Sequence, residues 1–190
     1  MRYSFAESEV GLLLALVIGG AASGKSEFAE SLAMSLSAER YYVATMQSYD
    51  AECDRRIERH RNMRSGKGFV TVERSLDLAG MELECGDAAV VLLECASTLL
   101  GNELCMPGGA GAASWQAILT GAERLVSRGI FVVIVTNDVF GEGEAATPEM
   151  REYSRQLGLL NQGLADIADL VVEVVCGLPQ VHKGGLILHN

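Results

Sequence analysis

The chain has 190 residues, of which 49% are hydrophobic and 21% charged, and it carries a net charge of −10 with a pI near 4.8. This length and composition predict one globular domain, residues 1–190, with a substantial buried core. The acidic excess argues against a general nucleic-acid or anionic-membrane binder, because such a protein needs a broad basic surface to neutralise phosphates.

Apolar runs rich in β-branched residues predict strands, and helix-length stretches lie between most of them. The strand candidates are residues 12–19, 41–46, 69–72, 89–94, 130–137 and 170–175. The helix candidates are residues 25–38, about 50–63, 75–84, 114–128 and 149–168. The strand candidates lack polar alternation, which is typical of strands buried on both faces of a parallel sheet. We therefore expect an α/β fold with a mostly parallel sheet flanked by helices.

Segments outside these elements carry weaker signals. Residues 1–10 are expected to form a flexible N-terminal extension. The breaker-rich segment 106–114 predicts a loop, either a lid over a ligand or a plain surface connection. The longest apolar run, residues 11–20, is too short to span a bilayer, and Glu7 and Glu9 stand where a signal peptide would carry positive charge. We expect a cytoplasmic protein without a membrane span.

The cysteines indicate neither a disulfide framework nor a zinc site, because their number is odd and no CxxC pair occurs. The simplest interpretation is that they are buried free thiols. They are Cys53, Cys85, Cys95, Cys105 and Cys176.

The stretch GGAASGKS, residues 19–26, matches the phosphate-loop pattern G-x-x-x-x-G-K-[ST] in full. A strand candidate precedes it and a helix candidate begins at Lys25, so backbone N–H groups and the helix dipole converge on a phosphate. Lys25 is expected on the β- and γ-phosphates, and the Ser26 hydroxyl on Mg²⁺. The expected nucleotide-binding residues here are Gly19, Gly20, Ala21, Ala22, Ser23, Gly24, Lys25 and Ser26. The sequence therefore predicts a nucleoside triphosphate site.

Glu94 ends a buried strand candidate, at the position where such proteins carry a second acidic element near the magnesium. A carboxylate at that edge is costly unless it is solvated or close to a cation. A role beside Mg²⁺ is favoured, and a structural carboxylate is the alternative.

An arginine cluster, DRRIERHRNMR at residues 54–64, surrounds His60 in an otherwise acidic chain. On a helix, Arg56, His60 and Arg64 share one face. Cationic neighbours disfavour the imidazolium, which leaves a neutral nitrogen as a nucleophile. Two interpretations remain open. His60 is either a nucleophile that attacks a molecule whose phosphates the arginines neutralise, or an ordinary surface histidine.

Several further segments, in this order and spacing, accompany the phosphate loop: RIERHR (56–61), LLECAST (92–98), VTNDV (135–139), TP (147–148), residues 158–179 and HKG (182–184). Together they resemble the bifunctional adenosylcobinamide kinase/adenosylcobinamide-phosphate guanylyltransferase family of cobalamin biosynthesis. The resemblance runs from about residue 16 to 185. It implies a P-loop NTPase fold of RecA-like type and a homotrimer.

The resemblance also implies roles for individual residues. His60 becomes the acceptor of GMP from GTP, and Glu94 stands where the family has an acid at a strand end. Asn137 and Asp138 match an Asn-Glu pair of the family, with a shorter acid in this sequence. Further nucleotide-binding residues implied in this way are Arg56, Arg59, Arg61, Glu73 and Glu94.

The expected activity has two steps. The γ-phosphate of ATP or GTP passes to a hydroxyl of adenosylcobinamide, and GMP from GTP then passes through His60 to that phosphate. Alternatives are a small-molecule kinase in which His60 is only structural, and a GTP-dependent switch or assembly protein.

Overall fold

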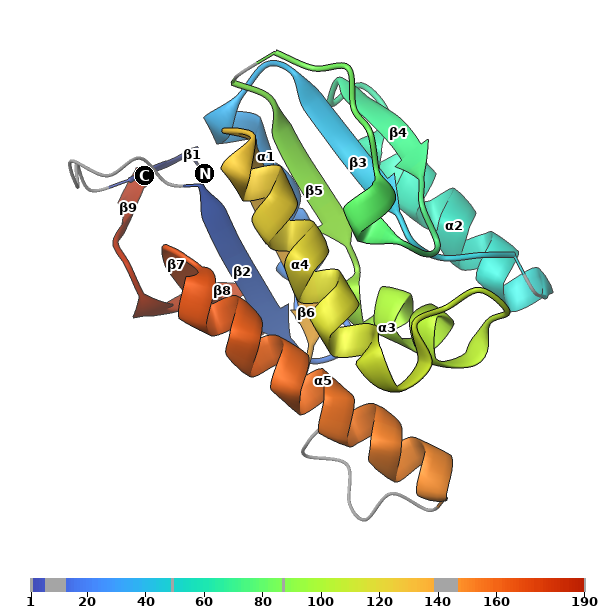
Figure 1. Ribbon diagram of the computed structural model, residues 1–190. Helices are drawn as coiled ribbons and strands as arrows, with labels where there is room; N and C mark the ends of the chain where they lie inside the picture. Colours follow the sequence, from blue (N-terminus) through green and yellow to red (C-terminus); the bar gives the residue numbers. More distant parts are fainter. Residues whose placement is uncertain (1, 6–12, 49, 87, 139–146, 190) are drawn as a thin grey trace.

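A seven-stranded sheet forms the centre of the molecule, with helices on both faces (Figure 1). The computed structural model describes residues 2–5, 13–48, 50–86, 88–138 and 147–189. In sheet order the strands are β4 (Phe69–Glu73), β3 (Arg40–Ala44), β5 (Val90–Glu94), β6 (Phe131–Asn137), β2 (Leu14–Gly19), β7 (Leu170–Val175) and β8 (Leu178–Lys183). Neighbouring strands are parallel except β7 and β8. The expected α/β class with a mostly parallel sheet is confirmed.

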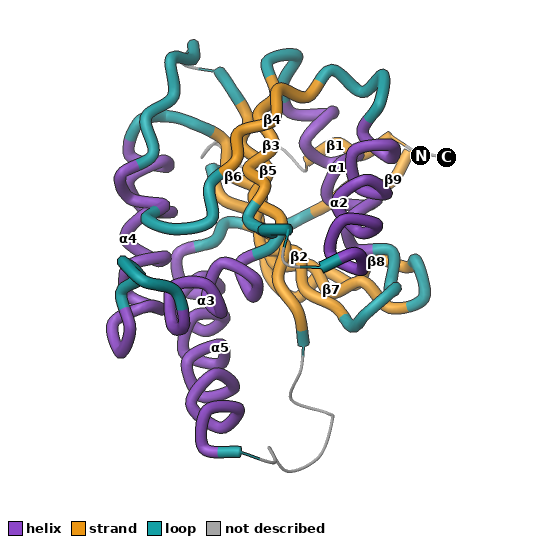
Figure 2. The backbone as a smooth tube through the Cα atoms, turned by 90° about the vertical axis from the view of Figure 1, so that its right-hand side faces the viewer, coloured by secondary structure: helices purple, strands orange, loops and turns teal. Residues whose placement is uncertain are grey.

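The helices divide between the two faces of the sheet (Figure 2). On one side lie α1 (Lys25–Leu36) and α2 (Ala51–Arg64), and on the other lie α3 (Ala96–Cys105), α4 (Ser114–Ser127) and α5 (Pro148–Ile167). Within the described residues, no helix combines the length and apolar character that crossing a membrane requires.

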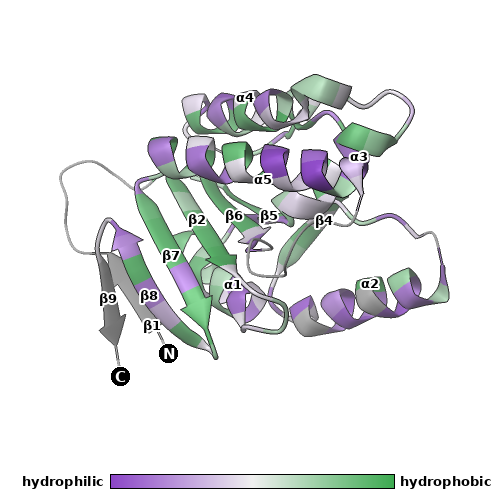
Figure 3. Cartoon of the chain, turned by 90° about the horizontal axis from the view of Figure 1, so that it is seen from below, coloured by the Kyte–Doolittle hydropathy of each residue, from purple (hydrophilic) through white to green (hydrophobic). Residues whose placement is uncertain are grey.

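The central strands are buried on both faces because alternate residues enter different hydrophobic clusters. In β2, Leu14 and Leu16 pack in the cluster that includes α3, α4 and α5, whereas Ala15 and Val17 pack in the cluster that includes α1. Figure 3 shows how hydrophobic these strands are, in contrast to the mostly hydrophilic α2. This packing holds the carboxyl ends of the parallel strands at one edge.

The expected helix over residues 75–84 is wrong, because the chain there forms only the 3-10 turn η1 (Leu78–Gly80). Asp77 has a left-handed backbone, with φ +54°. Its N–H donates to Glu103 Oε1 (2.6 Å) and its carbonyl accepts from the Arg74 guanidinium. Side chains thus satisfy backbone groups that a helix would pair internally. The helix α3, which the apolar pattern does not predict, begins at Ala96, one residue beyond the end of β5.

Strand β1 (Arg2–Phe5) pairs antiparallel with β9 (Leu186–His189) in a separate two-stranded sheet (Figure 1). Residues 2–5 belong to the segment expected to be a flexible extension, of which residues 1 and 6–10 lie outside the described part. The segment 106–114 is a loop, as predicted, with the short turn η2 (Gly111–Ala113) before α4.

The cysteines are free, but the expectation that they are buried is wrong. Cys105 and Cys176 are exposed, and Cys53, Cys85 and Cys95 are partly exposed. Most of them lie in α2, in loops or at helix ends, outside the apolar strands whose pattern suggested burial.

Candidate nucleotide-binding and catalytic site

A pocket of about 1210 Å³ opens at the carboxyl ends of the parallel strands. Open α/β sheets bind ligands at this edge, where loops from neighbouring strands converge. Its walls come from the phosphate loop, the ends of β3, β4, β5 and β6, and α2. The predicted residues with described side chains that line it are Ala21, Ala22, Ser23, Gly24, Lys25, Ser26, Arg59, His60, Arg61, Glu73 and Glu94.

The phosphate loop leads from β2 into α1, as the sequence predicts. Gly24 precedes the helix with φ +91°, a conformation that favours glycine. Gly19 is also required: a Cβ there would lie 2.6 Å from the carbonyl oxygen of Val174 and 2.7 Å from Ser23 Oγ. The loop is tied to the turn after β7, because Gly177 N donates to the Ser23 carbonyl (2.7 Å). Gly19 and Gly20 thus form the base of the loop, while residues 21–26 face the pocket.

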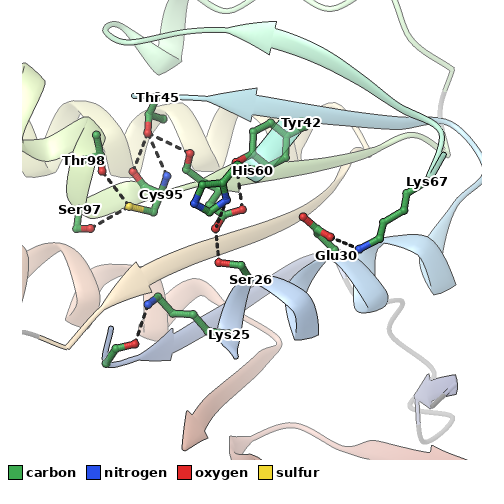
Figure 4. A network of polar contacts seen from close by, with 12 residues as sticks. Lys25, Ser26, Glu30, Tyr42, Thr45, His60, Lys67, Cys95, Ser97 and Thr98 are labelled. Carbon is green, nitrogen blue, oxygen red and sulfur yellow. Dashed lines mark hydrogen bonds and ion pairs between the residues drawn. The ribbon is translucent and has the colours of Figure 1, made fainter. Parts of the chain in front are cut away.

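The charged and hydroxyl groups of this loop lie at its helical end. The Lys25 ammonium donates to the Gly20 carbonyl at 2.9 Å, across the loop (Figure 4). Ser26 donates its hydroxyl proton to Glu94 Oε1, so the loop contacts the acid at the end of β5. The sequence-predicted pair of Ser26 and Glu94 is therefore brought together.

Glu94 contacts several side chains of the site, among them Ser26 and His60, which lie close together in Figure 4. Its Oε1 accepts from Ser26 and lies 3.6 Å from His60 Nδ1, while its Oε2 accepts from the Tyr42 hydroxyl at 3.1 Å. Hydroxyl and carboxylate oxygens suit Mg²⁺, which commonly completes its shell with water and nucleotide phosphates. No cluster of three His, Cys, Asp or Glu side chains that could hold a metal occurs in the described part of the chain. The hydroxyl of Ser26 and the carboxylate of Glu94 are oxygen donors of the kind that Mg²⁺ takes, so they fit an ion that a nucleotide shares.

His60 lies on α2 and faces Glu94, with its side chain 20% exposed. Its Nδ1 is buried and makes no hydrogen bond. Arg59 and Arg61 line the same pocket, and Arg61 pairs with Glu73 at 3.0 Å across the end of β4. The side chain of Arg56 lies outside the described part of the structure. The structure thus brings the histidine of the arginine cluster to the phosphate loop.

Tyr42 and Arg64 join this site, although the sequence pattern did not single them out as site residues. The guanidinium carbon of Arg64 stands 3.3 Å from the centre of the Tyr42 ring. Burial, together with the charge of Glu94, raises the pKa of the Tyr42 hydroxyl above its ordinary value, so it stays a donor to the carboxylate. In the sequence, Tyr42 is one of several apolar residues of a strand, and only the register of the sheet turns it toward Glu94.

Hydrogen bonds among Thr45 and residues at the ends of β5 and β6 join the strand ends beside the pocket. Thr45 accepts the Cys95 N–H at 3.0 Å, next to Glu94. Asn137 donates to Ser97 Oγ at 2.8 Å, and both Asn137 and Asp138 line the pocket. These contacts connect three neighbouring strand ends.

A parallel sheet, a G-x-x-x-x-G-K-S loop entering a helix, and an acid hydrogen-bonded to its serine define a P-loop nucleotide-binding protein of RecA-like fold. In accordance with this class, the FlaH flagellar accessory protein of Methanocaldococcus jannaschii superimposes with a TM-score of 0.50 at 14% identity, covering 91% of this chain and 79% of that one. Residues 15–181 match the family model for cobinamide kinase / cobinamide phosphate guanyltransferase. The chain belongs to this family.

Curated relatives agree with this assignment. The bifunctional adenosylcobalamin biosynthesis protein CobP of Pseudomonas aeruginosa is 34% identical over 172 residues, 89% of this chain and 96% of the relative. The bifunctional adenosylcobalamin biosynthesis protein CobU of Escherichia coli is 35% identical over 182 residues, 87% of this chain and 97% of the relative. The match therefore spans nearly the whole length of both relatives.

Proposed function

We propose that this protein phosphorylates adenosylcobinamide with ATP or GTP and then transfers GMP from GTP to the product through His60. Family membership supports the two reaction types, and the names of the relatives support a place in cobalamin biosynthesis. One observation carries the proposal for the site: His60 lies 3.6 Å from Glu94, which accepts from Ser26 of the phosphate loop. A candidate nucleophile and a triphosphate cradle therefore face one pocket.

In the kinase step, the substrate hydroxyl attacks the γ-phosphorus and the nucleoside diphosphate leaves. Backbone N–H groups of the loop and the Lys25 ammonium stabilise the charge on the phosphates. Ser26 and Glu94 would hold Mg²⁺, which neutralises phosphate charge when it is bound. Arg59 and Arg61, which line the pocket, add positive charge on the side of α2.

In the guanylyl step, a nitrogen of His60 forms a bond to the α-phosphorus of GTP, and pyrophosphate leaves. A proton on Nδ1, the nitrogen beside Glu94, keeps the lone pair on Nε2 for the attack. A phosphate oxygen of the phosphorylated corrinoid then attacks the same phosphorus. The N–P bond breaks, the GDP-linked corrinoid leaves, and free His60 is restored.

The remaining parts of the proposal follow from the family resemblance and the chemistry of the substrates. We propose one domain over residues 1–190 that works in the cytoplasm, where both nucleotides are available. We also propose a homotrimer, which the family resemblance implies. We place the corrin at a subunit boundary, because the pocket of about 1210 Å³ must also hold the nucleotide. Arg56 and Glu73 are proposed nucleotide contacts.

Incubation with α-labelled GTP and Mg²⁺, followed by intact mass, tests the covalent step. The expected result is a GMP adduct that is acid-labile and base-stable, as a phosphoramidate is. His60→Ala should abolish the adduct and keep kinase activity, whereas the matched change His182→Ala, on the exposed strand β8, should leave both unchanged. Kinase activity without an adduct on the wild-type protein would indicate a kinase only. GTP binding without turnover of any corrinoid would favour a switch protein, and an acid-stable adduct would exclude His60.

A further inference from the structure

No described side chain of α2, the helix that carries His60, belongs to either hydrophobic cluster of the sheet. Among the side chains of α2 that the structure describes, Arg64 alone is buried, with 7% of its surface exposed. Its Nη1 is buried and makes no hydrogen bond. Burying a guanidinium is costly unless a partner compensates. The face of the Tyr42 ring compensates here, at 3.3 Å from the guanidinium carbon.

The Tyr42 ring is itself held rigidly. It is 4% exposed and lies in β3, between β4 and β5. Phe69 packs edge-on against it, with ring centres 6.5 Å apart and planes at 81°. The other end of the side chain is fixed by the hydrogen bond to Glu94 Oε2. One buried ring therefore contacts both the anchor of α2 and the carboxylate beside the phosphate loop.

We propose that Tyr42 is a positioning residue for guanylyl transfer: its ring face holds Arg64 in place and thereby positions α2. Arg64 is four residues after His60, one turn along the same helix, so seating Arg64 sets where the imidazole lies. The proposal rests on the proposed function of His60. Tyr42 contacts neither reacting group, and it acts through Arg64.

Two substitutions of Tyr42 distinguish the contribution of its ring from that of its hydroxyl. Tyr42→Phe keeps the ring and removes only the bond to Glu94; we expect guanylylation of His60 within about 3-fold of wild type. Tyr42→Met fills the space without an aromatic face. It should slow adduct formation at least about 30-fold while kinase turnover stays within about 3-fold of Tyr42→Phe. Tyr41→Phe, on the neighbouring residue of β3, is the matched control and should change neither reaction.

Equal adduct formation in Tyr42→Met and wild type would overturn the proposal, and so would equal loss in Tyr42→Phe and Tyr42→Met. A second measurement needs neither substrate nor a core substitution. In nucleotide-free protein, Arg64→Met should speed amide hydrogen exchange at residues 58–64 by about 10-fold or more. Unchanged exchange would show that Arg64 does not anchor α2. Absence of any adduct on wild type would refute the proposed function, while the exchange experiment would still decide whether Arg64 anchors α2.

Discussion

Lys25 begins α1 and donates its ammonium protons to the Gly20 carbonyl on the opposite side of the phosphate loop. It is 9% exposed, so its charge acts in an environment from which most water is excluded. A cation in this place can stabilise negative charge that develops between the β- and γ-phosphates.

We therefore expect Lys25→Ala to lower kcat/KM of the kinase step by about 30-fold or more, which corresponds to about 2 kcal/mol. The backbone amides remain in the variant, but they carry only partial charges. Steady-state kinetics with ATP measure the effect, and Lys183→Ala, on the exposed strand β8, is the control. Near-normal turnover of Lys25→Ala would contradict the phosphate-loop assignment.

At this scale the sequence predicted the residues whose types are tied to one chemistry. The G-x-x-x-x-G-K-S spacing located the loop, and an acid at the end of an apolar run located Glu94. The proposed role of His60 as a nucleophile comes from the family resemblance, because spacing alone does not separate a nucleophile from a surface histidine. Tyr42 could not be predicted, since the choice between Tyr41 and Tyr42 as the residue facing Glu94 depends on the strand register.

Among the elements, α1 and α2 are linked by an ion pair outside the pocket. The Glu30 carboxylate of α1 has no exposed surface, and its Oε2 accepts from the Lys67 ammonium just beyond the end of α2 (Figure 4). Its Oε1 has no hydrogen-bond partner. Lys67 also offers its carbonyl to the Arg40 guanidinium at 2.8 Å. The turn after α2 is therefore fastened to the helix that follows the phosphate loop.

Lys67→Met should lower the free energy of unfolding by about 2 kcal/mol, because it leaves the buried Glu30 carboxylate without a counter-charge. This is less than for a fully buried pair, since the Lys67 side chain is 30% exposed. Urea denaturation measures the change. The double variant Glu30→Gln/Lys67→Met should recover most of the loss, and a double variant as unstable as the single one would show that the ion pair is not the cause.

Element prediction succeeded where burial alone determines the pattern and failed where side chains satisfy the backbone. The β2, β5 and β6 strands are continuous apolar runs, and the structure confirms them. The segment around η1 contains helix-compatible residues, yet Arg74 and Glu103 bond to the backbone of Asp77 and prevent a helix. The helix α3 follows the apolar strand β5 after one residue, so hydrophobicity gave no boundary between them.

Considered as a whole, the molecule is acidic, while its pocket receives cations from α2. The contacts of α2 and the following turn with the body include two ion pairs, Arg61 with Glu73 and Lys67 with Glu30. His60 adds a polar contact with Glu94. The hydrophobic clusters on the two faces of the sheet contain no described side chain of α2. Exposed ion pairs are weakened by salt, whereas apolar packing is not.

Raising KCl from about 0.05 to 0.5 M, where the Debye length falls from roughly 14 to 4 Å, should slow adduct formation on His60 more than it slows the kinase step. The kinase step depends chiefly on the loop between β2 and α1, which the apolar core supports. The ratio of the two rates in the same preparation is the measurement. A ratio independent of salt would show that charged contacts do not set the position of α2.

The separation of α2 from both hydrophobic clusters also affects what an unfolding curve reports. Cooperative units of a protein open independently when few buried apolar contacts join them. The single tryptophan, Trp115, packs against the cluster of α3, α4 and α5, so its fluorescence follows the melting of that core. A substitution that frays α2 can therefore leave the melting temperature unchanged while abolishing guanylyl transfer. Changes in melting temperature will underestimate damage to α2, and a local probe on this helix is needed to detect it.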